Sequence, residues 1–214
     1  MRFFDKKEDN LANISVHIAV AQEWAKKHKV ANLDDFVWGA VAPDILGKTQ
    51  GSHITHYCTK VFNDDMDLTY LKERYDNRVN IDNFLNSVNV NNDYELGYLL
   101  HLVTDKFYYS NFLDIEKIMN MCKTYSEVKK LVYQTYDATL KFVNETYNVN
   151  YQNKHRQMDG LFERYGNCYI EEEPILYTKE ELRMFIEQMS NVDLENFLKN
   201  HELKHKEEEN VRQI

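Results

Sequence analysis

Apolar residues recur along most of this chain at the three- to four-residue spacing of an amphipathic α-helix. The first such segment runs from residue 10 to about residue 28 and aligns on one face Leu11, Ile14, Ile18, Ala21 and Ala25. A longer segment, residues 126–149, aligns Val128, Leu131, Val132, Leu140, Val143 and Tyr147. Shorter helical patterns cover residues 67–77, 82–88, 153–165, 179–190 and 194–210. The pattern predicts an all-α protein.

The second helical segment is bounded by start and stop signals. Asparagine and aspartate at residues 32–34 can cap its N-terminus, and Pro43 is expected to end it, because proline disfavours helical geometry in the residue before it. Asp44 is therefore expected to project from a helix end. Residues 46–65, with two glycines and several polar residues, are expected to form a loop, and such loops commonly carry binding groups.

The most informative segment, residues 96–109, is almost wholly apolar yet contains His101 and Asp105. Residues 91–93 can cap this helix, and the four-residue spacing places the two polar side chains one turn apart on one face. A helix that is apolar on nearly all sides belongs in a core. An ionised Asp105 there would cost several kcal/mol unless its charge were compensated. A shared metal ion is one compensation, and ordinary pairing with core partners is the other.

Composition agrees with long helices and narrows the classes of function. The 214 residues include only 6 Gly and 2 Pro, which disfavours barrels, sandwiches and glycine-rich phosphate loops. A net charge of −9, with basic residues scattered among acidic ones, argues against an extended nucleic-acid interface. No apolar secretory signal or transmembrane stretch is present, and the three cysteines are widely spaced. We expect a cytoplasmic protein with reduced thiols.

The length fits one large domain, or a domain with an appendage. We expect residues 1–165 to form a helical metal-binding domain. Residues 166–214, which end in a charged helical pair, are expected to form an extension packed on it.

Candidate metal ligands occur in four separate segments: His17 in the first helix, Asp44 after the second, His53 and His56 in the loop, and His101 with Asp105 in the apolar helix. Each alone has an ordinary interpretation, as a core or surface histidine or as a turn aspartate. Together they provide imidazoles and carboxylates without a thiolate. This set suits zinc, and also iron, manganese or nickel, and it holds two ions if one carboxylate bridges them.

The order and context of these residues resemble the zinc-dependent phospholipase C family, helical metal phosphoesterases that are distantly related to zinc-dependent single-strand nucleases. The resemblance covers roughly residues 13–150 and rests on residues 17–21, 38–44, 52–53 and 97–105. By this similarity the metal ligands are His17, Asp44, His53, His101 and Asp105, with Asp105 as the bridging ligand. Residues 133–140 also look like a family segment, in which Asp137 would line the pocket or support the ligands.

The resemblance implies a hydrolase of small phosphate esters, such as a phospholipid or a nucleotide, in which Asp44 and Asp105 act with a metal-activated water. Secreted members of the family use an N-terminal tryptophan amino group, a further histidine where this chain has Asn111, and a later His-x3-Glu pair. This chain lacks these ligands, so one or two ions are expected rather than three. A binding or sensor module with a structural metal is the alternative.

Two other patterns carry less weight. His155 and Asp159 repeat the four-residue spacing, but we interpret them as surface residues. His201-Glu202-Leu203-Lys204-His205 is a literal His-Glu-x-x-His, the signature of zinc proteases. Only nine residues follow it, in a charged terminal helix, whereas that chemistry needs a third ligand downstream and a buried catalytic helix. A metalloprotease is therefore a minor alternative.

Overall fold

The computed structural model of this protein describes residues 14–166 and 172–201, which contain helices and no β-strand. The main helices are α1 (Ile14–Ala25), α2 (Leu33–Gln50), α3 (Ser52–Thr55), α4 (Leu71–Asp76), α5 (Ile81–Ser87), α6 (Asp93–Phe107), α7 (Ile115–Met121), α8 (Tyr125–Tyr147) and α9 (Lys179–Met189). Residues 194–201 form a further helical segment. The all-α prediction is therefore confirmed.

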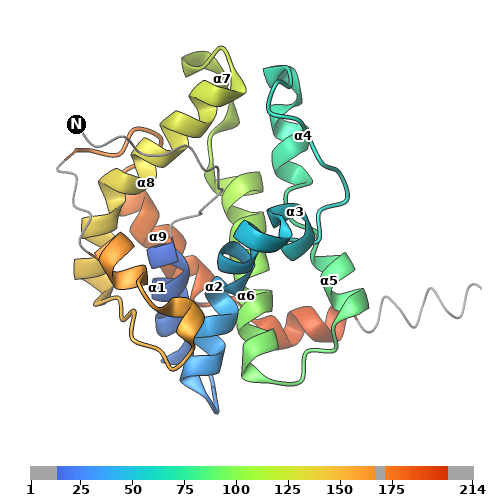
Figure 1. Cartoon of the computed structure of the whole chain (residues 1–214), viewed down its shortest axis with the longest axis vertical. Helices are drawn as coiled ribbons and strands as arrows, with labels where there is room; N and C mark the ends of the chain where they lie inside the picture. Colours follow the sequence, from blue (N-terminus) through green and yellow to red (C-terminus); the bar gives the residue numbers. More distant parts are fainter. Residues whose placement is uncertain (1–13, 167–171, 202–214) are drawn as a thin grey trace, which may run out of the picture.

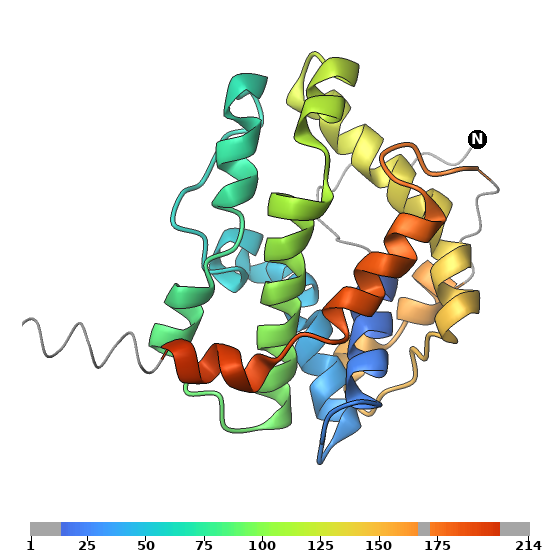
Figure 2. The same cartoon turned by 180° about the vertical axis from the view of Figure 1, so that it is seen from behind.

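Helix α6 runs through the middle of the molecule, with α4 and α5 on one side and α1, α8 and α9 on the other (Figures 1 and 2). Its N-terminus is capped by Asn92, whose side chain accepts a hydrogen bond from the backbone N–H of Glu95, as the sequence predicts. At its C-terminal end the chain continues into a π-helical turn, Tyr108–Phe112. The apolar segment with His101 and Asp105 therefore lies at the centre of the fold.

Helices α2 and α6 make the most extensive contact between any two helices of the described residues. A Cβ atom added at Gly39 would lie 2.0 Å from the carbonyl oxygen of Tyr94, and one added at Gly97 would lie 2.0 Å from the carbonyl oxygen of Phe36. The two glycines thus let the two backbones touch at their crossing. This contact fixes Asp44, five residues after Gly39, relative to the polar residues of α6.

The predicted end of the second helix at Pro43 is wrong, because α2 continues through Pro43 to Gln50. An internal proline removes a helical hydrogen bond and costs about 3 kcal/mol or more. Burial of the residues before it, among them Phe36 and Val41 at 0 % exposure, offsets this cost. Asp44 therefore lies within a buried helix and not at a helix end.

Other boundaries also differ from the sequence expectation. The expected loop of residues 46–65 contains the end of α2 and the short helix α3, while α7 had no counterpart in the expected pattern. The helix expected over residues 153–165 is reduced to a 3₁₀ turn, Arg156–Met158, and a π turn, Phe162–Gly166. Short stretches of this kind have too few periodic positions for a reliable interpretation.

The C-terminal part of the described chain belongs to the same core as the rest. Leu182, Phe185 and Ile186 of α9 are at most 2 % exposed, and the indole N–H of Trp24 in α1 donates to the carbonyl of Val192. Residues 194–201 lie beside α5 (Figures 1 and 2). Within residues 14–166 and 172–201, no helix has both the length and the apolar character needed to cross a bilayer.

Candidate metal centre

Five polar side chains from four segments meet inside this apolar core. They are His17 of α1, Asp44 of α2, His56 directly after α3, and His101 and Asp105 of α6. Each is at most 4 % exposed. So many buried titratable groups in one place would be costly unless their charges and lone pairs were compensated.

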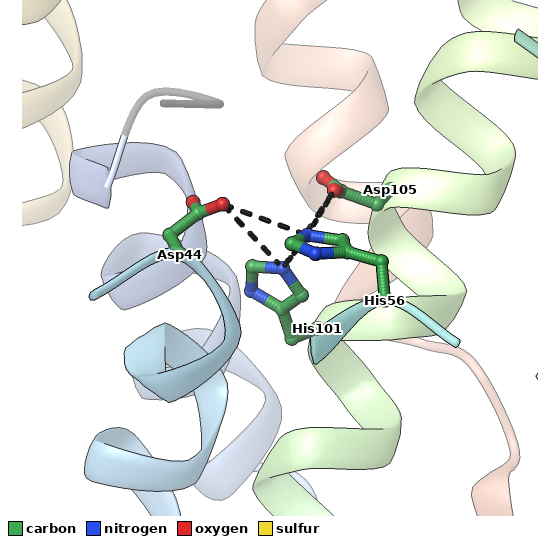
Figure 3. A group of neighbouring side chains, drawn as sticks. All are labelled: Asp44, His56, His101 and Asp105. Carbon is green, nitrogen blue, oxygen red and sulfur yellow. Dashed lines mark hydrogen bonds and ion pairs between the residues drawn. The ribbon is translucent and has the colours of Figure 1, made fainter. Parts of the chain in front are cut away.

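Four of these residues present ligand atoms to one point (Figure 3). The Nε2 atoms of His56 and His101 are 3.2 Å apart. One oxygen of Asp105, Oδ2, lies 3.3 Å from His56 Nε2 and 3.6 Å from His101 Nε2. Asp44 Oδ1 lies 3.6 Å and 3.9 Å from the same two nitrogens. All four atoms thus lie within 4.8 Å of one another.

Hydrogen bonds at the Nδ1 atoms of His56 and His101 fix the direction in which their Nε2 atoms point. His101 Nδ1 is 2.8 Å from the carbonyl oxygen of Ala40, and His56 Nδ1 is 2.8 Å from that of Ser52. A carbonyl oxygen can only accept, so both Nδ1 atoms donate. In the neutral rings both Nε2 atoms therefore carry lone pairs that face each other and the carboxylates. This backbone support is typical of histidines that bind metal ions.

The remaining carboxylate oxygens face the opposite side, where His17 lies. His17 Nε2 is 3.2 Å from Asp105 Oδ1 and 3.8 Å from Asp44 Oδ2. All three atoms are buried and have no hydrogen-bond partner within the described residues. The ring of His17 stacks on that of His101 with 4.0 Å between centroids. Both carboxylates therefore offer one oxygen to each side, which is the arrangement that a bridging ligand requires.

The pKa values follow from this crowding. Burial lowers the pKa of His56, but hydrogen bonds to Asp105 and Asp44 outweigh burial and raise that pKa to about 9. Burial and the proximity of the His17 ring lower the pKa of His101 to about 3. Burial favours the neutral form of Asp105, but the neighbouring histidines hold its pKa well below the usual value. Without a metal ion, the proton on His56 therefore lies between the carboxyl groups of Asp44 and Asp105, at the point where a metal cation would bind.

The spacing of the ligand atoms suits a small divalent ion. Zinc is bound tetrahedrally at about 2.0–2.1 Å by imidazole nitrogen and carboxylate oxygen, which places neighbouring ligand atoms roughly 3.3 Å apart. The distances of 3.2, 3.3 and 3.6 Å around His56, His101 and Asp105 lie close to that value. Two imidazoles and two carboxylates also form a donor set that suits zinc, iron, manganese or nickel. The group can therefore bind a metal ion.

The structure brings together most of the residues singled out in the sequence, with one exchange. His17, Asp44, His101 and Asp105 meet as expected, but His53 is exposed and lies outside the group, where His56 takes its place. Burial and a carbonyl partner four residues earlier distinguish His56 from His53. Neither feature can be read from Ser-His-Ile-Thr-His before the turn geometry of α3 is known.

The less weighted candidates lie elsewhere. Asp137 is on an exposed position of α8 and is not one of the grouped ligands. His155 pairs with Asp35 at 2.8 Å rather than with Asp159, which is exposed. Of the protease-like motif, His201 is described, while Glu202 and His205 lie outside the described residues.

Comparison of the chain with models of known protein families, with curated proteins and with solved structures finds no match.

Proposed function

We propose that this protein is a metal-dependent hydrolase of phosphate esters. The observation that supports it most is the convergence of the Nε2 atoms of His56 and His101 with oxygens of Asp44 and Asp105 at buried positions. The resemblance of residues 38–44 and 97–105 to helical metal phosphoesterases gives the reaction class. Zinc is the metal that the ligand set suits best, with one or two ions bound.

Each residue has a role in this proposal. His56 and His101 would hold an ion from one side and His17 from the other, while Asp105 would serve as the bridging carboxylate. When bound, a divalent ion supplies Lewis-acid chemistry, acidifying water and neutralising charge on a phosphoryl group. Asp44 has one oxygen, Oδ2, without a hydrogen-bond partner in the described residues, and this oxygen would accept the proton of the attacking water.

A non-catalytic metal-binding module is the second candidate, because all five side chains are at most 4 % exposed. Structural metal sites are closed, whereas catalytic sites keep a position open for water or substrate. The position of His56 favours catalysis, because this residue lines a pocket of about 570 Å³ that a substrate could enter. A ligand in that pocket would lie against His56, one of the proposed metal ligands.

Metal analysis combined with turnover tests the proposal. We expect the purified full-length protein to contain zinc or a related ion and to hydrolyse bis-p-nitrophenyl phosphate. Loss of a supporting residue around a metal typically costs 10- to 100-fold, so loss of the ligand in His101→Ala should lower turnover by more than about 100-fold and reduce metal content. His155→Ala, a histidine outside the group, is the matched control.

A protein without bound metal whose turnover survives His101→Ala would overturn the proposal. Bound metal without turnover, with metal lost in His101→Ala, would instead identify the non-catalytic module.

A further inference from the structure

The pocket beside His56 differs in charge from the rest of the protein. It is lined by residues of α2, α3, α4 and α8 and of the segments that follow α3 and α4; Figure 1 labels these helices. Five of its lining residues are cationic and one is acidic: Lys48, Lys60, Arg74, Arg78 and Lys129, against Asp64. The chain as a whole has a net charge of −9. A concentration of positive charge in an acidic protein needs an explanation of its own.

Internal ion pairs neutralise only part of this charge. Lys129 and Arg74 share Asp64, at 2.6 Å and 3.4 Å. Lys60 pairs with Glu73 at 2.6 Å. Two carboxylates, Asp64 and Glu73, thus pair with three cations, and Arg78 is a fourth cation in the pocket.

Arg78 differs from the other three cations, because the nearby charge of Asp105 stabilises it without direct contact. No carboxylate of residues 14–166 or 172–201 forms an ion pair with it, and its Nε is buried without a hydrogen-bond partner there. Its guanidinium lies over the ring of Tyr109, 4.5 Å from the centroid. A planar guanidinium held in place by an aromatic ring is a donor suited to phosphate oxygens.

From this pocket we infer a more specific substrate class, an inference that rests on the proposed function. The substrate carries a second phosphate group, besides the phosphoryl group at the metal centre, and Arg78 with Lys129 and Arg74 binds that second group. The volume of about 570 Å³ is that of a site for a small organic ligand. A substrate with a cationic group, such as a choline headgroup, would meet repulsion in the same place.

Calorimetric binding of inorganic pyrophosphate to the full-length protein tests the inference without turnover. We expect the affinity to fall about tenfold or more in Arg78→Gln, and two- to fivefold in Lys129→Gln, because charge-assisted hydrogen bonds to phosphate are lost. Lys129 is partly exposed, so this variant remains informative if Arg78→Gln does not fold. The matched control is Lys72→Gln on α4, exposed and outside the pocket, which should change the affinity less than twofold.

Two further experiments test whether the second phosphate belongs to a lipid headgroup and whether binding depends on the metal centre. Vesicles of phosphatidylcholine with phosphatidylinositol 4-phosphate present the second phosphate on a lipid headgroup. Binding to them alone, with the same dependence on Lys129, assigns the substrate to the membrane. The variant His101→Ala lacks a metal ligand but keeps the pocket. Most of the affinity for pyrophosphate should therefore persist when pyrophosphate is titrated into this variant.

The inference is overturned if neither probe binds, if Lys72→Gln weakens binding as much as Lys129→Gln, or if His101→Ala alone abolishes it. Arg78-dependent binding in a protein that does not hydrolyse phosphate esters would confirm the phosphate-binding pocket but would remove the proposed reaction, so that the bound molecule would be a ligand and not a substrate. Hydrolysis without any effect of the pocket variants would do the reverse.

Discussion

Two histidines three positions apart, His53 and His56, have different environments and should behave differently. His56 directs Nε2 into the ligand group, while His53 is exposed at the pocket. We expect His56→Ala to lose bound metal and turnover, because a ligand is removed. His53→Ala should keep its metal. Elemental analysis of the two purified variants checks this, and metal loss in His53→Ala alone would show that the ligands have been assigned to the wrong histidine.

The raised pKa of His56 gives a second expectation for single residues. With a pKa of about 9, this imidazole is protonated at pH 7.5 in the metal-free protein. A metal ion binds only the neutral form, so binding should release about one proton and become tighter as the pH rises toward 9. Zinc titrations in buffers of different ionisation enthalpy measure the released proton. A release unchanged by His56→Gln would show that the proton comes from elsewhere.

The sequence predicted the residues of the site better than their positions. His101 and Asp105 were recognisable because polar groups are costly in an apolar helix. Asp44 was recognised, but its place inside α2 was missed, because the cost of Pro43 is local whereas the packing that offsets it is tertiary. The family resemblance favoured His53 over His56, and the sequence could not correct this choice, because the direction of each side chain depends on the turn between α2 and α4.

At the scale of helices, the crossing of α2 and α6 sets the geometry of the centre. Gly39→Ala and Gly97→Ala would each place a Cβ 2.0 Å from a backbone oxygen of the other helix. The helices must then move apart, which should cost about 1–3 kcal/mol or more of unfolding free energy. Asp44 should move away from His101, so metal affinity should fall as well.

Gly47, which lies on α2 like Gly39, provides a matched control. At Gly47 the nearest atoms to an added Cβ are the hydroxyl oxygen of Thr55, at 3.1 Å, and the Cα atom of Ser52, at 3.2 Å. The higher helix propensity of alanine, about 1 kcal/mol, offsets this milder crowding, so Gly47→Ala should remain near wild-type stability. Denaturant unfolding and zinc titration of the three variants measure both effects. Equal behaviour of all three would argue that the crossing does not set the site.

For the whole molecule, the helical class followed from composition and periodicity, whereas the way its parts pack did not. Six glycines and two prolines leave few turns. The two long amphipathic segments form α1 and α8, and the apolar segment forms α6, almost as expected. The short α7 and the irregular chain after α8 were not predictable, because tertiary contacts decide such segments.

Truncation separates the roles of the C-terminal residues. A chain that ends at Asn200 should keep its fold, metal and turnover, because the ligand group lies on α1, α2, α6 and the turn after α3. A protease using His201 and His205 would lose activity in the same variant. Thermal unfolding, metal analysis and turnover of this variant distinguish the two.

A chain that ends at residue 171 should not fold. It would lose the buried side chains Leu182, Phe185, Ile186 and Leu194. At about 1.5–3 kcal/mol each, their combined loss, roughly 6–12 kcal/mol, is comparable with the whole stability of a domain, about 5–15 kcal/mol. A cooperative unfolding transition in this variant would show that the C-terminal segment is an independent addition.

The close approach of α2 and α6 at Gly39 and Gly97 also constrains how this protein can diverge. Neither helix can gain or lose a residue between its glycine and its ligands without turning those ligands by about 100° away from the centre. Descendants that keep the centre must therefore keep two short strings together, Gly-x4-Asp and Gly-x3-His-x3-Asp, while the rest of the sequence changes. The pair of strings is a pattern by which distant relatives of this protein can be recognised when overall similarity has disappeared.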